Sequence, residues 1–290
     1  KGTPTRTADQ IAAAIEGVGG SLSASSGDDF LTVSVDVLSD HADLAFDLMG
    51  EVTRRATFPV DELELARTQA LSALALALSQ PQTVADRFFS REVYGRHPYG
   101  RSPTTESYGA ITQDDVKRFA AARIRPGGAL LVIAGDVTLA RAQSLAQKAF
   151  RGWVGAPALV PPPPTPPTHS ATDILLVHRP GSVQGNVVIG NTTFPPTDPG
   201  YYAARVATQV LGGGVDARLF LILREQKSWT YGSYARLDRK RGLGNFVATF
   251  EGRTEVVDSA LVELLHQVDR MRTELVPDSE LTNVKGFLVG

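Results

Sequence analysis

A short sequence pattern occurs twice in this chain, 218 positions apart. The hexapeptide FPVDEL at Phe58–Leu63 has a counterpart, VPDSEL, at Val276–Leu281, and each follows an amphipathic stretch that itself follows two predicted strands. The shift superimposes identical or similar residues: Pro59 on Pro277, Glu62 on Glu280, Leu63 on Leu281 and Arg67 on Lys285. A repeated plan of this kind indicates duplication. We therefore predict two homologous domains.

Strand and helix patterns alternate in both halves. Alternating apolar and polar residues predict a hairpin at Ser21–Ser25 and Leu31–Val37, and a second pair of strands at Trp229–Leu237 and Gly244–Glu251. The continuous apolar run at Ala129–Ala134 predicts a strand covered on both faces. Two further strands are predicted at Asp173–His178 and Asn186–Gly190. We expect an α+β fold in which each domain packs a mainly antiparallel sheet against helices.

A proline-rich stretch separates the two halves. Residues 157–167 contain seven of the eighteen prolines, which favours an extended, stiff linker. The predicted organisation is a first domain at 1–156, a linker at 157–170 and a second domain at 171–290. Comparison of the repeats further predicts that both domains are incomplete. About one strand and one helix are expected before Lys1, and the equivalent of residues 73–136 is expected after Gly290, which aligns with Ser72 in the middle of a helix.

Composition excludes several classes of function. A net charge of -2 and a pI near 6.2 give no basic footprint for nucleic acid. The absence of cysteine excludes disulfides and thiolate zinc sites, and no apolar run is long enough to predict a membrane span. None of the five histidines lies three or four residues from another, so the chain lacks the helical two-histidine zinc motif.

The segment Leu211–Tyr231 combines a glycine run, an amphipathic helix and two polar residues. The glycines Gly212–Gly214 lack the lysine and hydroxyl residues that complete a phosphate-binding loop, so they predict a helix stop or a close approach. Arg224 and Tyr231 lie seven positions apart, at the end of the helix and the start of the next strand. They are either a surface arginine and a tyrosine buried in the sheet, or a functional pair.

The order of these motifs along the chain resembles the insulinase/pitrilysin family of zinc peptidases. It is most similar to bacterial members with two similar domains per chain, which are related to the mitochondrial processing peptidase subunits. The matching features are Lys1-Gly2-Thr3 followed by a helix, two glycines and a hairpin; FPVDEL; HPYG at 97–100; GDV at 135–137; the proline-rich linker; and LGGG, RLF, LRE and TYG within 211–232.

The resemblance implies that this chain holds no zinc ligand. In the family, a His-x-x-Glu-His motif precedes the segment that matches Lys1-Gly2-Thr3, and a glutamate further along completes the metal site. The positions where the family has glutamates are Ser72 and Ala73 here, and Glu62 and Glu64 lie too early on the helix to replace them. Zinc is therefore expected in a partner or in the segment before Lys1.

The resemblance also implies roles for four residues. Arg224 and Tyr231 match an arginine and a tyrosine that act on the substrate in the partner's zinc cleft, and Ser23 and Ala24 match a strand to which peptides add. The expected protein is a non-catalytic subunit that supplies Arg224 and Tyr231 to a zinc-bearing homologous subunit, or to a second copy of itself, for the hydrolysis of unfolded peptides. Alternatives are an active zinc endopeptidase whose zinc motif precedes Lys1, and a non-proteolytic structural subunit. Many bacterial members are exported, which favours the periplasm.

Overall fold

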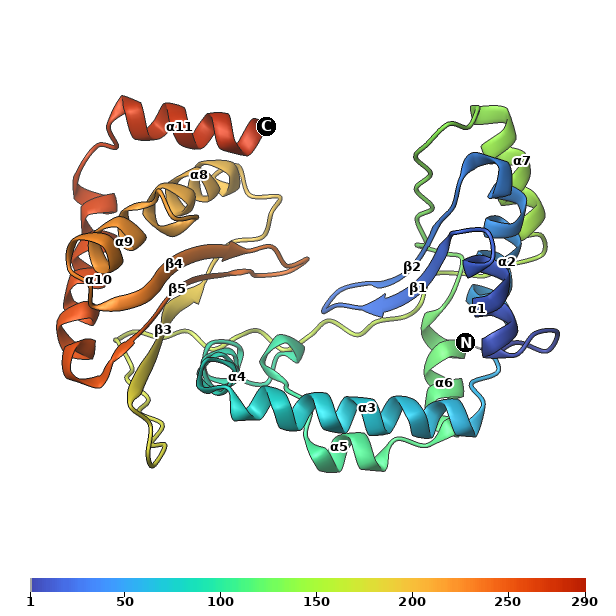
Figure 1. The fold of residues 1–290 in the computed structure, drawn as a ribbon, viewed down its shortest axis with the longest axis horizontal. Helices are drawn as coiled ribbons and strands as arrows, with labels where there is room; N and C mark the ends of the chain where they lie inside the picture. The colour runs from blue at the N-terminus through green and yellow to red at the C-terminus, as the bar shows by residue number, and fades with distance from the viewer. Residues whose placement is uncertain (1) are drawn as a thin grey trace. The chain divides into compact units, whose positions relative to one another are not determined.

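A computed structural model describes residues 2–290, so Lys1 of the Lys-Gly-Thr motif lies outside the described residues. The fold combines helices with antiparallel sheets, as predicted (Figure 1). In the first half the elements are α1 (Ala8–Glu16), β1 (Ser21–Ser26), β2 (Leu31–Asp36), α2 (Ala42–Arg55), α3 (Val60–Ser79), α4 (Pro81–Tyr94), α5 (Thr105–Ala110), α6 (Gln113–Arg123) and α7 (Leu139–Ala149). In the second half they are β3 (Gln184–Thr192), α8 (Tyr201–Gly212), α9 (Arg218–Phe220), a π-helix (Leu221–Gln226), β4 (Thr230–Asp238), β5 (Asn245–Arg253), α10 (Val257–Thr273) and α11 (Asp278–Val289).

The repeat is visible in the order and spacing of the elements. Each half contains a helix, a hairpin and two further helices. The helices α2 and α10 end 218 positions apart, at Arg55 and Thr273, and α3 and α11 begin 218 positions apart, at Val60 and Asp278. The two halves therefore share one plan, which confirms the predicted duplication.

By its contacts the chain divides into two compact units. Unit 1 comprises Lys1–Ala75 and Pro103–Pro162, and unit 2 comprises Leu76–Ser102 and Pro163–Gly290. The segment with α4 belongs to unit 2, where the Tyr94 hydroxyl donates to the Leu243 carbonyl at 3.2 Å. These units are defined by contacts, whereas the predicted domains were defined by the sequence repeat and the proline-rich linker. The predicted bounds 1–156, 157–170 and 171–290 therefore stay a prediction.

In unit 1 the hairpin packs against α1 and α2. The helix α1 begins at a capping box in which Thr7 and Gln10 exchange hydrogen bonds. Ile11 and Ile15 of α1 recur at helical spacing and bury one face against the hairpin and α2. Their partners in this core are Leu22, Leu48 and Val52.

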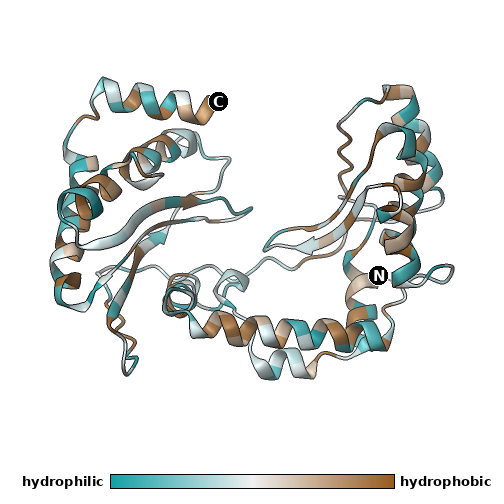
Figure 2. Cartoon of the chain, in the orientation of Figure 1, coloured by the Kyte–Doolittle hydropathy of each residue, from teal (hydrophilic) through white to brown (hydrophobic). Residues whose placement is uncertain are grey.

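In unit 2 a three-stranded antiparallel sheet has the order β3-β5-β4. Its core lies between the sheet and the helices α8, α9 and α10, and hydrophobic and hydrophilic stretches alternate along these helices (Figure 2). The fully buried members are Leu219 and Leu223 from the helical segment, Ala248 and Phe250 from β5, and Ala260 and Leu264 from α10.

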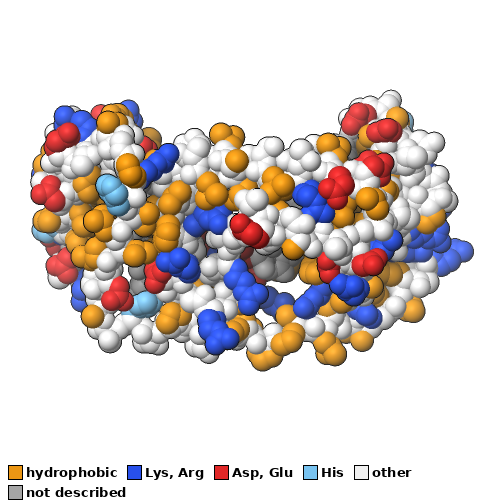
Figure 3. Space-filling view, turned by 90° about the horizontal axis from the view of Figure 1, so that it is seen from below, with side chains coloured by type: hydrophobic (Ala, Val, Ile, Leu, Met, Phe, Trp, Pro, Cys, Tyr) orange, Lys and Arg blue, Asp and Glu red, His pale blue; other side chains and the backbone are white. Residues whose placement is uncertain are grey.

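Two predicted strands are wrong. Residues 129–134 and 173–178 form no strand, and no strand of residues 2–290 pairs with them. Without a partner their apolar side chains stay in solvent: Leu130 is 86% exposed and Ile174 is also 86% exposed. Hydrophobic side chains lie among charged ones on the face shown in Figure 3. The other predicted strands form β1 to β5.

Within residues 2–290, no helix is both long enough and apolar enough to cross a membrane.

Candidate functional site

Arg224 lies on a single turn of π-helix. The sequence predicts one regular helix around Leu219 and Leu223, but α9 ends at Phe220 and a π-helix continues over Leu221–Gln226. The wider turn closes with a hydrogen bond from the Lys227 N–H to the Ile222 carbonyl, five residues earlier, at 3.0 Å. Such turns occur often at functional sites.

The side chain of Arg224 reaches solvent and has only weak partners. It is 49% exposed, and its Nε lies 3.8 Å from Oε1 of the exposed neighbour Glu225. The guanidinium lies over the ring of Phe220, 4.8 Å from the centroid. An exposed ion pair at this distance contributes little, so the aromatic ring orients the guanidinium and its donors remain available for a carbonyl or carboxylate.

A tight turn connects the π-helix to β4. Ser228 adopts a φ of 52°, in the left-handed region, and the Trp229 N–H donates to the carbonyl of buried Leu223 at 3.0 Å. This is the bond pattern that ends many helices, usually with glycine at the left-handed position. It fixes the chain direction between Arg224 and Tyr231.

Lys227 connects the same turn to α10. Its Nζ lies 3.4 Å from Oε2 of Glu263 and 4.5 Å from the centroid of the Trp229 ring. Burial raises the pKa of Glu263, but hydrogen bonds from Gln267 and Lys227 and the charge of Lys227 outweigh that effect, so the pKa lies below its ordinary value. Sequence reasoning missed this pair, because 36 positions separate its members and no local pattern joins them.

Tyr231 is the extra residue of a β-bulge. Along β4, Thr230 pairs with Gly252 and Gly232 with Glu251, so the register shifts around Tyr231. A bulge changes the direction in which a side chain points, and the Tyr231 side chain is 60% exposed. The alternative of a tyrosine buried in the sheet is therefore wrong. Arg224 and Tyr231 are both accessible residues of one helix–turn–strand unit.

The glycine run serves packing. Gly212 ends α8, and a Cβ at this position would lie 2.3 Å from the backbone nitrogen of Ala235 in β4, whereas Gly214 faces open space. Gly212 is required because the helix and the strand approach closely there. Of the two predictions for the glycine run, a helix stop or a close approach, the close approach is the one that this contact describes.

Ser23 and Ala24 lie on β1 in unit 1. They pair with Ser34 and Val33 of β2 and are exposed. No second strand of residues 2–290 pairs with β1. An edge strand of this kind can accept an added strand.

The donor chemistry at the expected ligand positions does not fit zinc. Ser72 and Ala73 are exposed on α3, and an alkyl side chain cannot ligate a metal while a hydroxyl is a poor zinc ligand. Across residues 2–290, no group of three or more histidine, aspartate or glutamate side chains could hold a metal ion.

Comparison with known proteins adds independent findings. Residues 1–105 match the family model described as Insulinase (Peptidase family M16), and residues 110–288 match the model described as Peptidase M16 inactive domain. An uncharacterized zinc protease of Mycobacterium leprae is 30% identical over the whole chain, which spans 66% of that protein's length.

Two solved structures share the fold. The peptidase M16 inactive domain from Pseudomonas fluorescens superimposes with a TM-score of 0.89 at 24% identity, over 100% of this chain and 71% of that chain. A protease from Helicobacter pylori superimposes with a TM-score of 0.91 at 18% identity, over 98% of this chain and 70% of that chain. Two relatives from different bacteria thus support the same α+β architecture.

Proposed function

Because this chain belongs to the insulinase (M16) family of peptidases, we propose that it is the subunit that supplies Arg224 and Tyr231 to a zinc-bearing homologous subunit. The observation that carries this proposal is the exposure of both side chains on one helix–turn–strand unit. Arg224 is 49% exposed and Tyr231 is 60% exposed, although the π-helix and β4 that carry them pack into the core of unit 2.

The two side chains suit peptide hydrolysis. The guanidinium of Arg224 presents several donors in one plane and can bind carbonyl or carboxylate oxygens of a peptide. The phenol of Tyr231 can donate a hydrogen bond to the oxygen of the scissile carbonyl as negative charge develops on it. In this role the chain positions and polarises a peptide, and the zinc-bearing subunit supplies the metal.

The edge of β1 provides a second contact for the substrate. An unfolded peptide that adds to this edge would form backbone hydrogen bonds beside Ser23 and Ala24, whose side chains are small and exposed. Backbone bonding of this kind accepts many sequences but requires an extended chain. The proposed substrates are therefore unfolded peptides.

Residues at the expected ligand positions support a partner role. Since Ser72 and Ala73 cannot replace a glutamate ligand, we propose that zinc belongs to the partner subunit. The partner is a homologous chain with an intact zinc motif; a second copy of this protein is the alternative if its own upstream segment carries one.

The experiment is a reconstitution. Cleavage of a fluorogenic unstructured peptide is measured for the full-length protein, for a zinc-bearing homologue encoded beside it, and for their mixture. We expect low activity for each chain alone and a large, saturable increase for the mixture. Stoichiometric zinc with full activity in the isolated protein would favour an active endopeptidase instead, and a stable complex without cleavage would favour a structural subunit.

A further inference from the structure

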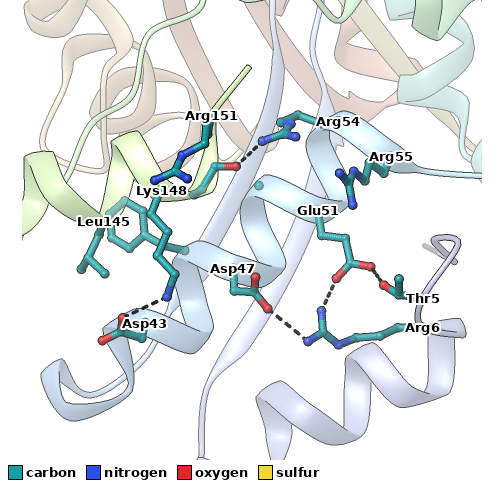
Figure 4. A pocket seen from close by; sticks show the side chains of 13 residues that line it. Thr5, Arg6, Asp43, Asp47, Glu51, Arg54, Arg55, Leu145, Lys148 and Arg151 are labelled. Carbon is teal, nitrogen blue, oxygen red and sulfur yellow. Dashed lines mark hydrogen bonds and ion pairs between the residues drawn. The ribbon is translucent and has the colours of Figure 1, made fainter. Parts of the chain in front are cut away.

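Unit 1 contains a charged cavity that is separate from Arg224, Tyr231 and β1. It has a volume of about 550 Å³ and lies between α2, α7 and the segment before α1 (Figure 4). Phe46 and Leu145 are its main apolar lining, while five cationic and three acidic side chains also line it. The volume is within the range of small-molecule sites, about 300–1,000 Å³.

The three carboxylates that line the cavity already have cationic partners. The ion pairs are Asp43 with Arg141 and Lys148, Asp47 with Arg6, and Glu51 with Arg6. Glu51 also accepts hydrogen bonds from the hydroxyls of Thr3 and Thr5. These carboxylates are therefore not available to neutralise the remaining cations of the cavity.

Three arginines remain at one end of the cavity. Figure 4 shows Arg54, Arg55 and Arg151 on the side away from Asp43 and Arg6. Arg54 donates from Nη1 to the Ala149 carbonyl at 2.6 Å, which caps the end of α7. Arg55 and Arg151 are exposed, and neither has an ion-pair partner among residues 2–290.

Close packing of two helices brings these arginines together. A Cβ on Gly50 of α2 would lie 2.6 Å from the carbonyl oxygen of Ala149, the last residue of α7. The end of α7 therefore packs closely against α2 at Gly50, more than one turn before α2 ends at Arg55. Cations near the C-terminal end of a helix interact favourably with its dipole, which accounts for Arg54 and Arg55 in the last turn of α2. It does not account for Arg151, which follows the end of α7 and adds a third arginine to the mouth of the same cavity.

We propose that this cavity binds a small polyanion with adjacent phosphoryl groups, such as an organic diphosphate. Guanidinium groups match phosphate oxygens with paired hydrogen bonds, and the three positive charges exceed the charge of about −1.5 to −2 on one phosphoryl group. The cavity is also larger than a single phosphate requires. Arg55 and Arg151 would bind the ligand directly, and Arg54 would contribute the donors that it does not use on Ala149.

The test uses inorganic pyrophosphate and inorganic phosphate as probes. Titration calorimetry at constant ionic strength measures their binding to the protein and to the variant Arg55→Gln/Arg151→Gln. The control, Arg118→Gln/Arg272→Gln, removes the same charge at two arginines that are 72% and 79% exposed and lie outside the cavity. The single variant Arg151→Gln is a second test, since its side chain follows the end of α7 and holds no helix in place.

We expect saturable binding of pyrophosphate, tighter than that of phosphate. The cavity double variant should bind it at least about tenfold more weakly, because it loses the charged hydrogen bonds of two guanidinium groups, while the control should bind as the wild type does. The proposal is overturned if pyrophosphate does not bind saturably, if the cavity variants bind it unchanged, or if the control loses as much affinity.

Discussion

Lys227, on the turn between Arg224 and Tyr231, forms an ion pair with Glu263 of α10, with 3.4 Å between Nζ and Oε2. Glu263 in turn accepts a hydrogen bond at 2.7 Å from Gln267, which is buried. The turn that separates the two proposed functional residues is thus attached to the core helix of unit 2.

Replacing Glu263 by glutamine should therefore destabilise unit 2 in a pH-dependent way. At pH 7 we expect a loss of about 1 kcal/mol in the free energy of unfolding. The pKa of Glu263 is lowered in the folded protein, so its contribution is present above the unfolded pKa, near 4.3, and is lost as the pH falls through the lower folded pKa. Denaturant unfolding between pH 7 and 3 measures this difference.

The matched control is Glu255→Gln, which changes an exposed glutamate that has no ion pair among residues 2–290. Because Glu255 lies in the turn before α10, where its charge interacts with the helix dipole, its replacement should cost about 0.3–0.5 kcal/mol, less than Glu263→Gln. An equal cost for both variants, or a Glu263→Gln cost that does not shrink in acid, would contradict the role of the ion pair.

Ser228 should not tolerate β-branched residues. Its φ of 52° is costly for β-branched side chains, so Ser228→Val is expected to cost about 1–2 kcal/mol. Ser228→Gly should be neutral or slightly stabilising, since glycine adopts this conformation freely. Thermal unfolding compares the two variants, and a valine variant as stable as the glycine variant would show that the turn is not formed as described.

Two neighbouring glycines should respond in opposite ways. Gly212→Ala places a methyl group 2.3 Å from the Ala235 nitrogen, so we expect a loss of about 1–3 kcal/mol from overpacking. Gly214→Ala meets no atom within 4 Å and should change stability by less than about 0.5 kcal/mol. Equal effects on the unfolding midpoint would disprove the close approach of α8 and β4.

Peptide binding at β1 should depend on backbone amides. If peptides add beside Ser23 and Ala24, N-methylation of alternate amides removes donors from the added strand and should weaken competition at least about tenfold. Methylation of the other set of amides is the matched control and should have a smaller effect. Inhibition of the reconstituted cleavage measures both, and identical inhibition by the two peptides would exclude strand addition.

Local patterns predicted much of the fold. The hairpin β1–β2 was predictable because alternating residues such as Leu31, Val33 and Val35 repeat every second position. The repeated hexapeptide indicated the common order of elements, in which α11 follows α10 as α3 follows α2. The stretches 129–134 and 173–178 have the same apolar composition as strands, but a strand forms only beside a partner, and none lies beside them within residues 2–290.

The sequence predicted which residues form the candidate site, but it did not predict the backbone geometry that exposes their side chains. The spacing of Arg224 and Tyr231 is a sequence property, whereas the π-helix and the bulge that expose them arise from packing of Leu223 and the register of β4 against β5. The ion pair of Lys227 and the cavity of unit 1 depend on contacts between distant segments. No short-range pattern could predict them.

The most direct test of the central proposal is the effect of Tyr231→Phe on cleavage in the reconstituted complex. Tyr202→Phe is the matched control, because Tyr202 is 71% exposed on α8 of the same unit. If the Tyr231 hydroxyl stabilises the developing oxyanion, kcat should fall by about 10²-fold or more, with KM and complex formation little changed and with no effect of Tyr202→Phe. A Tyr231→Phe complex that retains the wild-type kcat would contradict the proposed function.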